Sequence, residues 1–239
     1  MTFESNVRGT YSILEAIRLF PDSIESIVIA SSDKSYGSYS EDKMPYKENY
    51  PLKPIYPYDV SKACADMISR SYACDVYNLP IVVTRFSNIY GPGQLNFSAI
   101  MPDAIRSALG FTTFIPRGDG SQIRDFIFVE DVVQLYLVIS EKLSRNPIKY
   151  SGEIYNAGTN KPLSVRKVIE KIYENIGNYK DLENVIKLMS KKKTIGEINC
   201  QYMDFQKVNQ FFGWEPKHSF ELGLDKTIKW YEKYLKEIQ

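Results

Sequence analysis

Two apolar runs, and the helical segment that separates them, constrain the fold of this chain more than any other feature. The runs at residues 26–30 and 81–86 are short and apolar, as in strands buried on both faces of a sheet. The segment at residues 58–77 carries small and apolar residues at helical spacing. A strand, a helix and a second strand with a long crossover predict a βαβ unit, and therefore a parallel sheet.

The remainder of the chain continues in the same α/β style. We expect further helices at residues 2–20, 98–109, 130–143, 164–176, 204–212 and 219–238, and strands at residues 112–115 and 152–158. Ser164 is a favourable N-cap for the helix that follows it. The length of 239 residues suits one large α/β domain, or one domain with a smaller lobe.

The charge balance and the few metal-binding residues exclude several classes of function. Lys and Arg number 30 and Asp and Glu number 29, so a net charge of +1 provides no bulk attraction to nucleic acid or membranes. The three cysteines and the single histidine, His218, lack metal-ligand spacing, so we expect no metal site. Without a secretory or membrane-spanning apolar run, and with reduced thiols, we expect a cytoplasmic protein.

Polar side chains follow the first strand, at residues 31–37, where open α/β sheets bind ligands. Tyr58 and Lys62 are spaced i, i+4 at the start of the next helix, which places both on one face. We expect the ammonium to lower the pKa of the phenol, so that Tyr58 acts as a base while Ser32 hydrogen-bonds the same substrate oxygen. Surface pairs at this spacing are common, so the pattern gains weight only from the polar turn before it.

A second polar turn, at residues 87–93, follows the second strand. Because the carboxyl ends of parallel strands meet at one edge of a sheet, we expect Asn88 to face the same crevice as Ser32.

Five segments resemble, in their order along the chain, the signatures of extended short-chain dehydrogenase/reductases, and more narrowly those of the NAD-dependent sugar-nucleotide epimerase/dehydratase family. The segments are Asn6-Val7-x-Gly9-Thr10, Ser31-Ser32-Asp33-Lys34-Ser35-Tyr36-Gly37, Tyr58-x-x-Ser61-Lys62, Arg85-Phe86-Ser87-Asn88-Ile89-Tyr90-Gly91-Pro92 and Arg124-Asp125-Phe126-Ile127-Phe128-Val129-Glu130-Asp131. The resemblance runs nearly end to end. It implies an α/β fold, a partial Rossmann-like doubly wound parallel sheet with a smaller C-terminal α/β substrate-binding lobe.

The resemblance also implies a division of the chain. Residues 1–95 would form the C-terminal part of the NAD-binding Rossmann domain, with the catalytic residues. Residues 96–239 would form mainly the substrate-binding lobe, with some segments returning to the Rossmann domain. Members of the family are commonly homodimers through two helices, and we expect the helix that begins at Tyr58 to be one of them.

The resemblance implies a role for each cofactor-facing residue. Tyr58 would be the catalytic base, Lys62 would tune it and bind the nicotinamide ribose, and Ser32 would hydrogen-bond the reacting sugar oxygen. Asn6 and Ser87 would contact NAD.

Three further residues would contact the nucleotide-sugar substrate. Asn88 would meet the region of its diphosphate, and Arg124 would bind that diphosphate through charge-assisted hydrogen bonds. Asn156 is a candidate for the nucleotide end. The alternative for Arg124 is a surface Arg-Asp pair.

Asp33 and Lys34 narrow the reaction that the resemblance implies. Dehydratases of the family follow the catalytic hydroxyl residue with an acid and a second proton-transfer group, and an Asp-Lys pair is similar to the CDP-glucose 4,6-dehydratases. Asp33 would protonate the departing 6-hydroxyl, and Lys34 would remove the C5 proton, which a ketone at C4 makes acidic. The alternative is an exposed ion pair in an epimerase-like or reductase-like relative.

The glycine-rich start of the family is not found in this sequence. Relatives open with a strand, a glycine-rich turn and a helix that binds the NAD pyrophosphate, and no Gly-x-Gly-x-x-Gly occurs here. We therefore expect an N-terminally truncated form. Either it is active with a missing N-terminal Rossmann segment, or it is a non-catalytic relative that only binds a nucleotide sugar or a partner.

Overall fold

The computed structural model describes residues 1–193 and 197–238. Its central sheet is parallel and has the order β1-β2-β6, formed by β1 (Ile27–Ser32), β2 (Ile81–Phe86) and β6 (Ile154–Ala157). Ile27 lies opposite Ile81, and Val83 lies opposite Ile154. The prediction of an α/β fold with a parallel, Rossmann-like sheet is confirmed.

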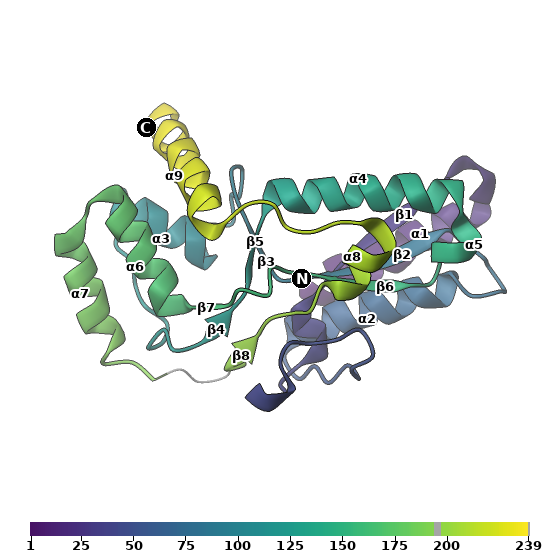
Figure 1. The fold of residues 1–239 in the computed structure, drawn as a ribbon, viewed down its shortest axis with the longest axis horizontal. Helices are drawn as coiled ribbons and strands as arrows, with labels where there is room; N and C mark the ends of the chain where they lie inside the picture. Colours follow the sequence, from purple (N-terminus) through teal and green to yellow (C-terminus); the bar gives the residue numbers. More distant parts are fainter. Residues whose placement is uncertain (194–196, 239) are drawn as a thin grey trace.

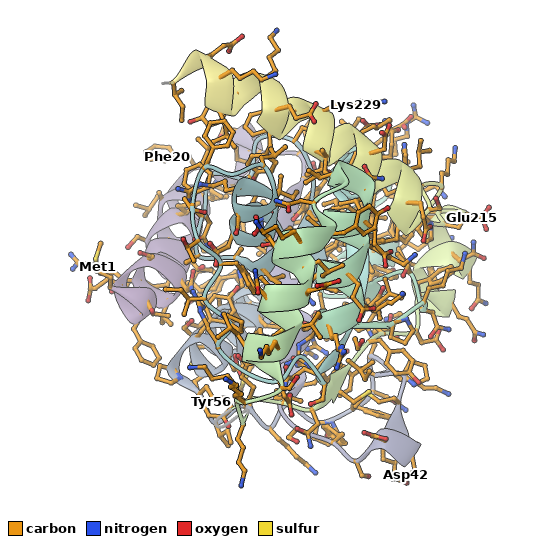
Figure 2. The ribbon with its side chains drawn as sticks, turned by 90° about the vertical axis from the view of Figure 1, so that its left-hand side faces the viewer. Met1, Phe20, Asp42, Tyr56, Glu215 and Lys229 are labelled. Atoms are coloured by element: carbon orange, nitrogen blue, oxygen red, sulfur yellow. The ribbon has the colours of Figure 1, made fainter. Side chains whose placement is uncertain are left out.

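Helices cover both faces of this sheet (Figure 1). Because successive side chains of a strand point to opposite faces, Ile81 of β2 packs with α1 (Gly9–Leu19) and α2 (Pro57–Tyr72), whereas Val82 packs with α4 (Val129–Arg145). The π-helical turn η1 (Glu4–Arg8) leads into α1, and η2 (Pro21–Ser23) ends it. Figure 2 shows Met1 and Phe20, at the two ends of this helical segment, at the surface.

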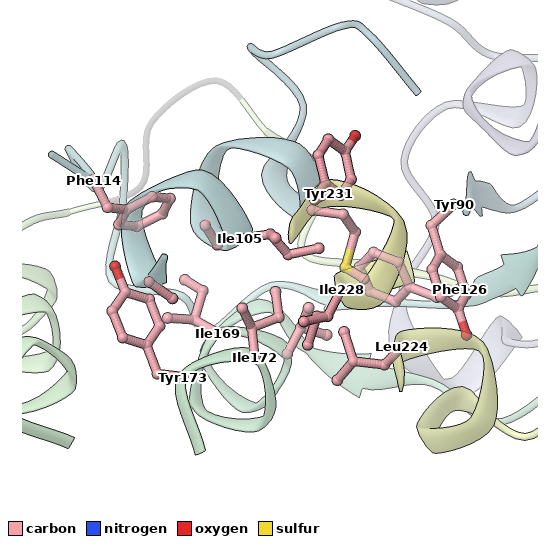
Figure 3. Close-up of a cluster of buried hydrophobic side chains, with 14 of the residues drawn as sticks. Tyr90, Ile105, Phe114, Phe126, Ile169, Ile172, Tyr173, Leu224, Ile228 and Tyr231 are labelled. Carbon is pink, nitrogen blue, oxygen red and sulfur yellow. The ribbon is translucent and has the colours of Figure 1, made fainter. Parts of the chain in front are cut away.

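A second group of helices packs beside the sheet around its own core. The helices are α3 (Ile100–Ala108), α6 (Val165–Ile176), α7 (Tyr179–Met189) and α9 (Phe220–Glu237). Figure 3 shows this core, in which Ile105, Ile169, Tyr173 and Ile228 are all buried. We call these four helices, together with the short strands at residues 123–124, 163–164 and 200–201, the lobe.

Short strands connect the helices of the lobe to the central sheet. A parallel pair is formed by β3 (Asn88–Tyr90) and β5 (Phe126–Phe128), and a mixed sheet of order β7-β4-β8 by β7 (Leu163–Ser164), β4 (Ile123–Arg124) and β8 (Cys200–Gln201). The remaining elements are η3 (Asp33–Tyr36), η4 (Glu41–Lys43), α5 (Pro147–Tyr150) and α8 (Gln206–Phe212). No helix in the described ranges is both long and apolar enough to cross a membrane.

Most predicted elements are present, with three differences. The strand predicted at residues 112–115 is wrong: Phe114 is buried in the core of the lobe, and its backbone N–H is bonded to Ser107 Oγ instead of a neighbouring strand. The helix predicted at residues 58–77 ends at Tyr72. Residues 88–90, expected in a turn, form β3. The Ser164 cap is confirmed, because its side chain accepts a hydrogen bond from the Lys167 N–H.

Candidate active site

Two cavities adjoin where the central sheet meets the lobe. The first, the strand-end cavity, has a volume of about 470 Å³ and lies at the carboxyl ends of β1 and β2. It is lined by seven of the residues singled out in the sequence, namely Ser32, Asp33, Lys34, Tyr58, Lys62, Ser87 and Asn88. The second, the lobe cavity, has a volume of about 170 Å³ and includes Arg124. Asn88, Arg117 and Phe126 line both cavities.

The turn after β1 orients Ser32 and Asp33. Ser32 caps η3: its Oγ accepts a hydrogen bond from the Lys34 N–H at 3.3 Å and donates one to Asp33 Oδ1 at 3.0 Å. Asp33 is only 2% exposed, and its Oδ2 has no hydrogen-bond partner among the described residues. Burial raises the pKa of this carboxyl, and the cations of Lys34 and Arg124 offset part of that rise. Asp33 therefore retains its proton to higher pH than an exposed carboxyl does.

Lys34 points from the same turn toward the lobe. Its Nζ donates a hydrogen bond to Gln201 Oε1 at 3.4 Å. Gln201 lies on β8, beside Arg124 on β4, and is fully buried. The contact joins the turn of the central sheet to the lobe.

Tyr58 and Lys62 both line the strand-end cavity. Lys62 Nζ donates to the Ala30 carbonyl at 2.6 Å. The pKa of the Tyr58 phenol is raised, first by burial and then by the carboxylates of Asp33 and Asp59. Lys62 is not among the groups that shift this pKa here, because its ammonium is bonded to the Ala30 carbonyl, and the expected lowering of the Tyr58 pKa by Lys62 stays a prediction.

Two expected cofactor contacts lie in different surroundings. The Ser87 Oγ is buried, lines the strand-end cavity and has no partner among the described residues. Asn6 lies outside both cavity linings: its Nδ2 donates to Ser61 Oγ at 2.9 Å, and Ser61 Oγ donates to the Tyr58 carbonyl at 2.7 Å. Asn6 thus braces the first turn of α2, the turn that carries Tyr58.

Arg124 is an interior side chain, so the alternative of a surface Arg-Asp pair is wrong. Arg124 is 6% exposed, its guanidinium donates to the carbonyls of Ile123 and Asn199, and a carboxylate oxygen of Glu197 lies 3.5 Å away. Burial lowers its pKa, although nearby acids counter this. Asn88 Nδ2 donates to the Asp125 carbonyl at 3.1 Å, which places its amide at the wall shared by the two cavities.

Asn156 is not brought together with the other site residues. It is fully buried on β6, where its Oδ1 accepts from the Tyr36 hydroxyl at 2.7 Å and its Nδ2 donates to the Tyr46 carbonyl at 3.2 Å. Neither cavity includes it. Since its amide already has protein partners, we correct the expected contact with the nucleotide and assign Asn156 to anchoring the loop after β1.

Three residues of the site were missed from the sequence. Asp59 is buried on α2 with a pKa raised by burial, Gln201 contacts Lys34, and Arg117 reaches the wall common to both cavities. Asp59 lies within the Tyr58-to-Lys62 segment, which is the one signal that pointed to any of them. The other two come from turns and strands too short to show a pattern.

A parallel sheet with a Tyr-x-x-x-Lys pair and a polar turn at one cavity defines a short-chain dehydrogenase/reductase of the extended type. The family model described as "GDP-mannose 4,6 dehydratase" matches residues 1–227. The chain belongs to this family of sugar-nucleotide dehydratases and epimerases, which confirms the resemblance seen in the sequence.

Individual relatives agree with this assignment. The human dTDP-D-glucose 4,6-dehydratase is 32% identical over 232 residues, which cover 95% of this chain and 62% of the relative. The structure of dTDP-glucose 4,6-dehydratase from Bacillus anthracis in complex with NAD has a TM-score of 0.84 and 34% identity, over 98% of this chain and 70% of that one. The structure of UDP-glucose 4-epimerase from Thermotoga maritima with UDP-glucose has a TM-score of 0.81 and 26% identity, over 98% of this chain and 71% of that one. The chain thus spans less than two thirds of the human relative.

Proposed function

We propose that this chain is the catalytic and substrate-binding part of an NAD-dependent sugar-nucleotide 4,6-dehydratase. The observation that carries the proposal is the shared lining of the strand-end cavity, where Asp33 and Lys34 lie with Ser32, Tyr58 and Lys62. A dehydratase needs an acid and a base in addition to the groups that oxidise an alcohol. The Asp33-Lys34 pair supplies both.

NAD is the cofactor that the family and the cavity favour. The buried, unpartnered Ser87 Oγ lines the strand-end cavity, and an unmade hydrogen bond of this kind is expected where a ligand completes it. Ser87, Tyr58 and Lys62 would hold the nicotinamide end. When bound, NAD would supply the hydride acceptor for C4 and the hydride donor for C6.

The chain's own residues would move the protons. Tyr58 takes the proton of the C4 hydroxyl, with Ser32 bonded to the same oxygen. Lys34 then removes the C5 proton, which the new C4 ketone has acidified, and Asp33 gives its proton to the C6 hydroxyl, which leaves as water. Lys34 returns its proton to C5 when hydride is added at C6. The raised pKa of Asp33 favours its protonated form relative to an exposed carboxyl, as a proton donor requires. The raised pKa of Tyr58 requires a cation to restore the phenolate, and Lys62, one turn along α2, is placed to supply it.

The substrate would extend from the strand-end cavity into the lobe cavity. Its sugar would occupy the first and its nucleoside the second, so the diphosphate would lie near Asn88 and Arg124. A CDP-linked sugar is the proposal for the substrate class, because Asp-Lys follows Ser32.

The second candidate function is sugar-nucleotide epimerisation, favoured by the likeness to UDP-glucose 4-epimerase. The two reactions share the oxidation at C4 and differ in the product. A 4-keto-6-deoxy sugar supports the dehydratase, whereas a C4 epimer with an intact C6 hydroxyl contradicts it and removes Asp33 and Lys34 from their roles. A chain that binds a nucleotide sugar and never converts it would be a non-catalytic relative.

Two partners complete the proposal. In the described part of the chain, β1 pairs only with β2, and its other edge is free to receive a further parallel strand, such as the glycine-rich segment expected from the family. A second copy of the chain is the other partner, because α2 leaves Met67 61% exposed on the helix expected at a dimer interface. Light scattering of Met67→Asp beside the unaltered chain tests the dimer. A cytoplasmic location stays a prediction.

Calorimetric titration of NAD is the first experiment. Saturable binding supports a usable cofactor site, and nucleotide-sugar turnover follows as the next assay. If NAD does not bind even when a glycine-rich N-terminal segment is supplied, the proposed function fails.

A further inference from the structure

The contact between Lys34 and Gln201 suggests a role for a residue that no motif includes. This inference rests on the proposed function, which assigns the C5 proton to Lys34. Gln201 Oε1 accepts the Lys34 Nζ hydrogen bond at 3.4 Å, and Gln201 is fully buried while Lys34 lines the cavity. The buried amide therefore holds the mobile end of a long side chain at the cavity wall.

Among the described residues, two carboxyls lie close enough to Lys34 for its cation to lower their pKa. Asp33 precedes it in the same turn, and Asp59 faces it from α2. Burial raises the pKa of both carboxyls, so each retains its proton to higher pH than an exposed one does. Arg124 lies on the strand beside Gln201. Around Gln201 itself, the titratable neighbours are the Tyr46 phenol and the Cys200 thiol, and burial raises the pKa of each, so both are neutral near pH 7.

We propose that Gln201 is the positioning residue of Lys34, a neutral acceptor that fixes the amine at the cavity wall without stabilising its protonated form as a carboxylate would. A base must be free of its proton to take one from C5. A carboxylate partner would hold the lysine in the ammonium form, because opposite charges within hydrogen-bonding distance favour the charged state. A neutral amide gives the same geometry with a smaller penalty for losing the proton.

The substitution Gln201→Glu tests this directly, since it changes the charge and keeps the shape. Arg124 on the adjacent strand helps to keep the new carboxylate ionised. The readout is the rate at which Lys34 is acetylated by dilute acetic anhydride, measured by peptide mass spectrometry as a function of pH, with exposed Lys236 as the internal reference. We expect labelling of Lys34 to become about tenfold slower near neutral pH, with its midpoint moved to higher pH.

Two companion variants separate this effect from simple loosening. Gln201→Met removes the acceptor without adding a charge, so the Lys34 ammonium loses its partner and the labelling midpoint moves to lower pH. Gln206→Glu places the same charge at an exposed position of α8 and leaves the midpoint unchanged. If the two substitutions at position 201 acted only by loosening the structure, both would shift the labelling midpoint of Lys34 in the same direction. The proposal is overturned if the unaltered chain and a folded Gln201→Glu variant have the same labelling midpoint. If that variant does not fold, an unchanged labelling midpoint in Gln201→Met overturns the proposal.

A second readout keeps this inference distinct from the proposed function. In a preparation that turns over a nucleotide sugar, Gln201→Glu should slow the exchange of deuterium from solvent into C5 and shift its pH profile upward, with KM unchanged. Absence of turnover in the unaltered protein counts against the proposed function alone, because the labelling experiment needs no turnover. Turnover with an unshifted pH profile in Gln201→Glu overturns the role of Gln201 and leaves the dehydratase standing.

Discussion

Arg85 and Asp66 form a two-point ion pair in the interior, between β2 and α2. The Nε–Oδ2 distance is 2.8 Å and the Nη2–Oδ1 distance is 3.0 Å, and neither side chain is more than 1% exposed. The Arg85 guanidinium also lies 4.7 Å from the centre of the Tyr36 ring, and Tyr36 ends the turn that carries Asp33 and Lys34. The ion pair therefore holds Arg85 against the residue that ends this turn, and so helps to fix the turn in place.

Removing one partner of this pair should destabilise the fold strongly. Asp66→Asn leaves a buried guanidinium without its counter-charge, at a cost of about 3–5 kcal/mol in the free energy of unfolding. Urea unfolding followed by circular dichroism measures it. The double variant Arg85→Met with Asp66→Leu should lose less than the single one, because no charge remains buried. Equal losses in both would show that the charge pair is not the cause.

Gly158 should tolerate no larger side chain, because of a buried carboxylate. A Cβ at this position would lie 2.3 Å from Asp125 Oδ2, and that oxygen is held by the N–H groups of Thr159 and Asn160. Gly158→Ala should therefore cost about 1–3 kcal/mol of stability. The control is Gly9→Ala, where the nearest atom is 3.8 Å away in a helical segment, and we expect a gain of about 1 kcal/mol. Thermal unfolding of both variants measures these changes in stability. An unchanged melting temperature in Gly158→Ala would mean that the turn at residues 158–160 can move away from the added methyl group at no cost.

The elements that the sequence predicted well are those set by local chemistry. The β2 strand has the predicted bounds because six apolar or buried residues lie between Pro80 and a polar turn. The Ser164 cap depends on a hydrogen bond three residues away. The shared cavity of Ser32, Tyr58 and Asn88 was also predictable, because the carboxyl ends of parallel strands coincide.

What escaped prediction depends on contacts between distant segments. The strands β4, β7 and β8 have two residues each, too few for any periodicity, and they exist because they pair with one another. The Lys62 ammonium binds the Ala30 carbonyl, which lies 32 residues away, and no spacing rule within a helix foretells it. Asn156 was misassigned for the same reason: its partners, Tyr36 and Tyr46, come from a loop more than 100 residues earlier.

The stability of the chain should depend on the charge of Asp33. The pKa of this carboxyl is raised in the folded state, so its contribution to stability is fully present below the unfolded pKa and is lost as pH rises through the folded pKa. Asp33→Asn removes that loss, so the variant should be more stable than the unaltered chain near pH 8, by on the order of 1 kcal/mol, and should lose this advantage toward about pH 4. Melting temperatures across this range measure it. The exposed substitution Asp75→Asn is the control and should leave the pH dependence unchanged.

Tyr58 should be essential for turnover and dispensable for folding. Its side chain is 45% exposed at the strand-end cavity, so Tyr58→Phe removes one hydroxyl and little packing. Loss of a positioned acid-base group lowers a rate by about 10²–10⁴-fold, and we expect kcat for conversion of the nucleotide sugar to fall within that range while KM and the melting temperature stay unchanged. Tyr11→Phe, at a phenol that is 41% exposed on α1, serves as the control and should retain full activity. The assay is formation of the 4-keto product, and a Tyr58→Phe enzyme with an undiminished rate would assign the C4 proton to another group.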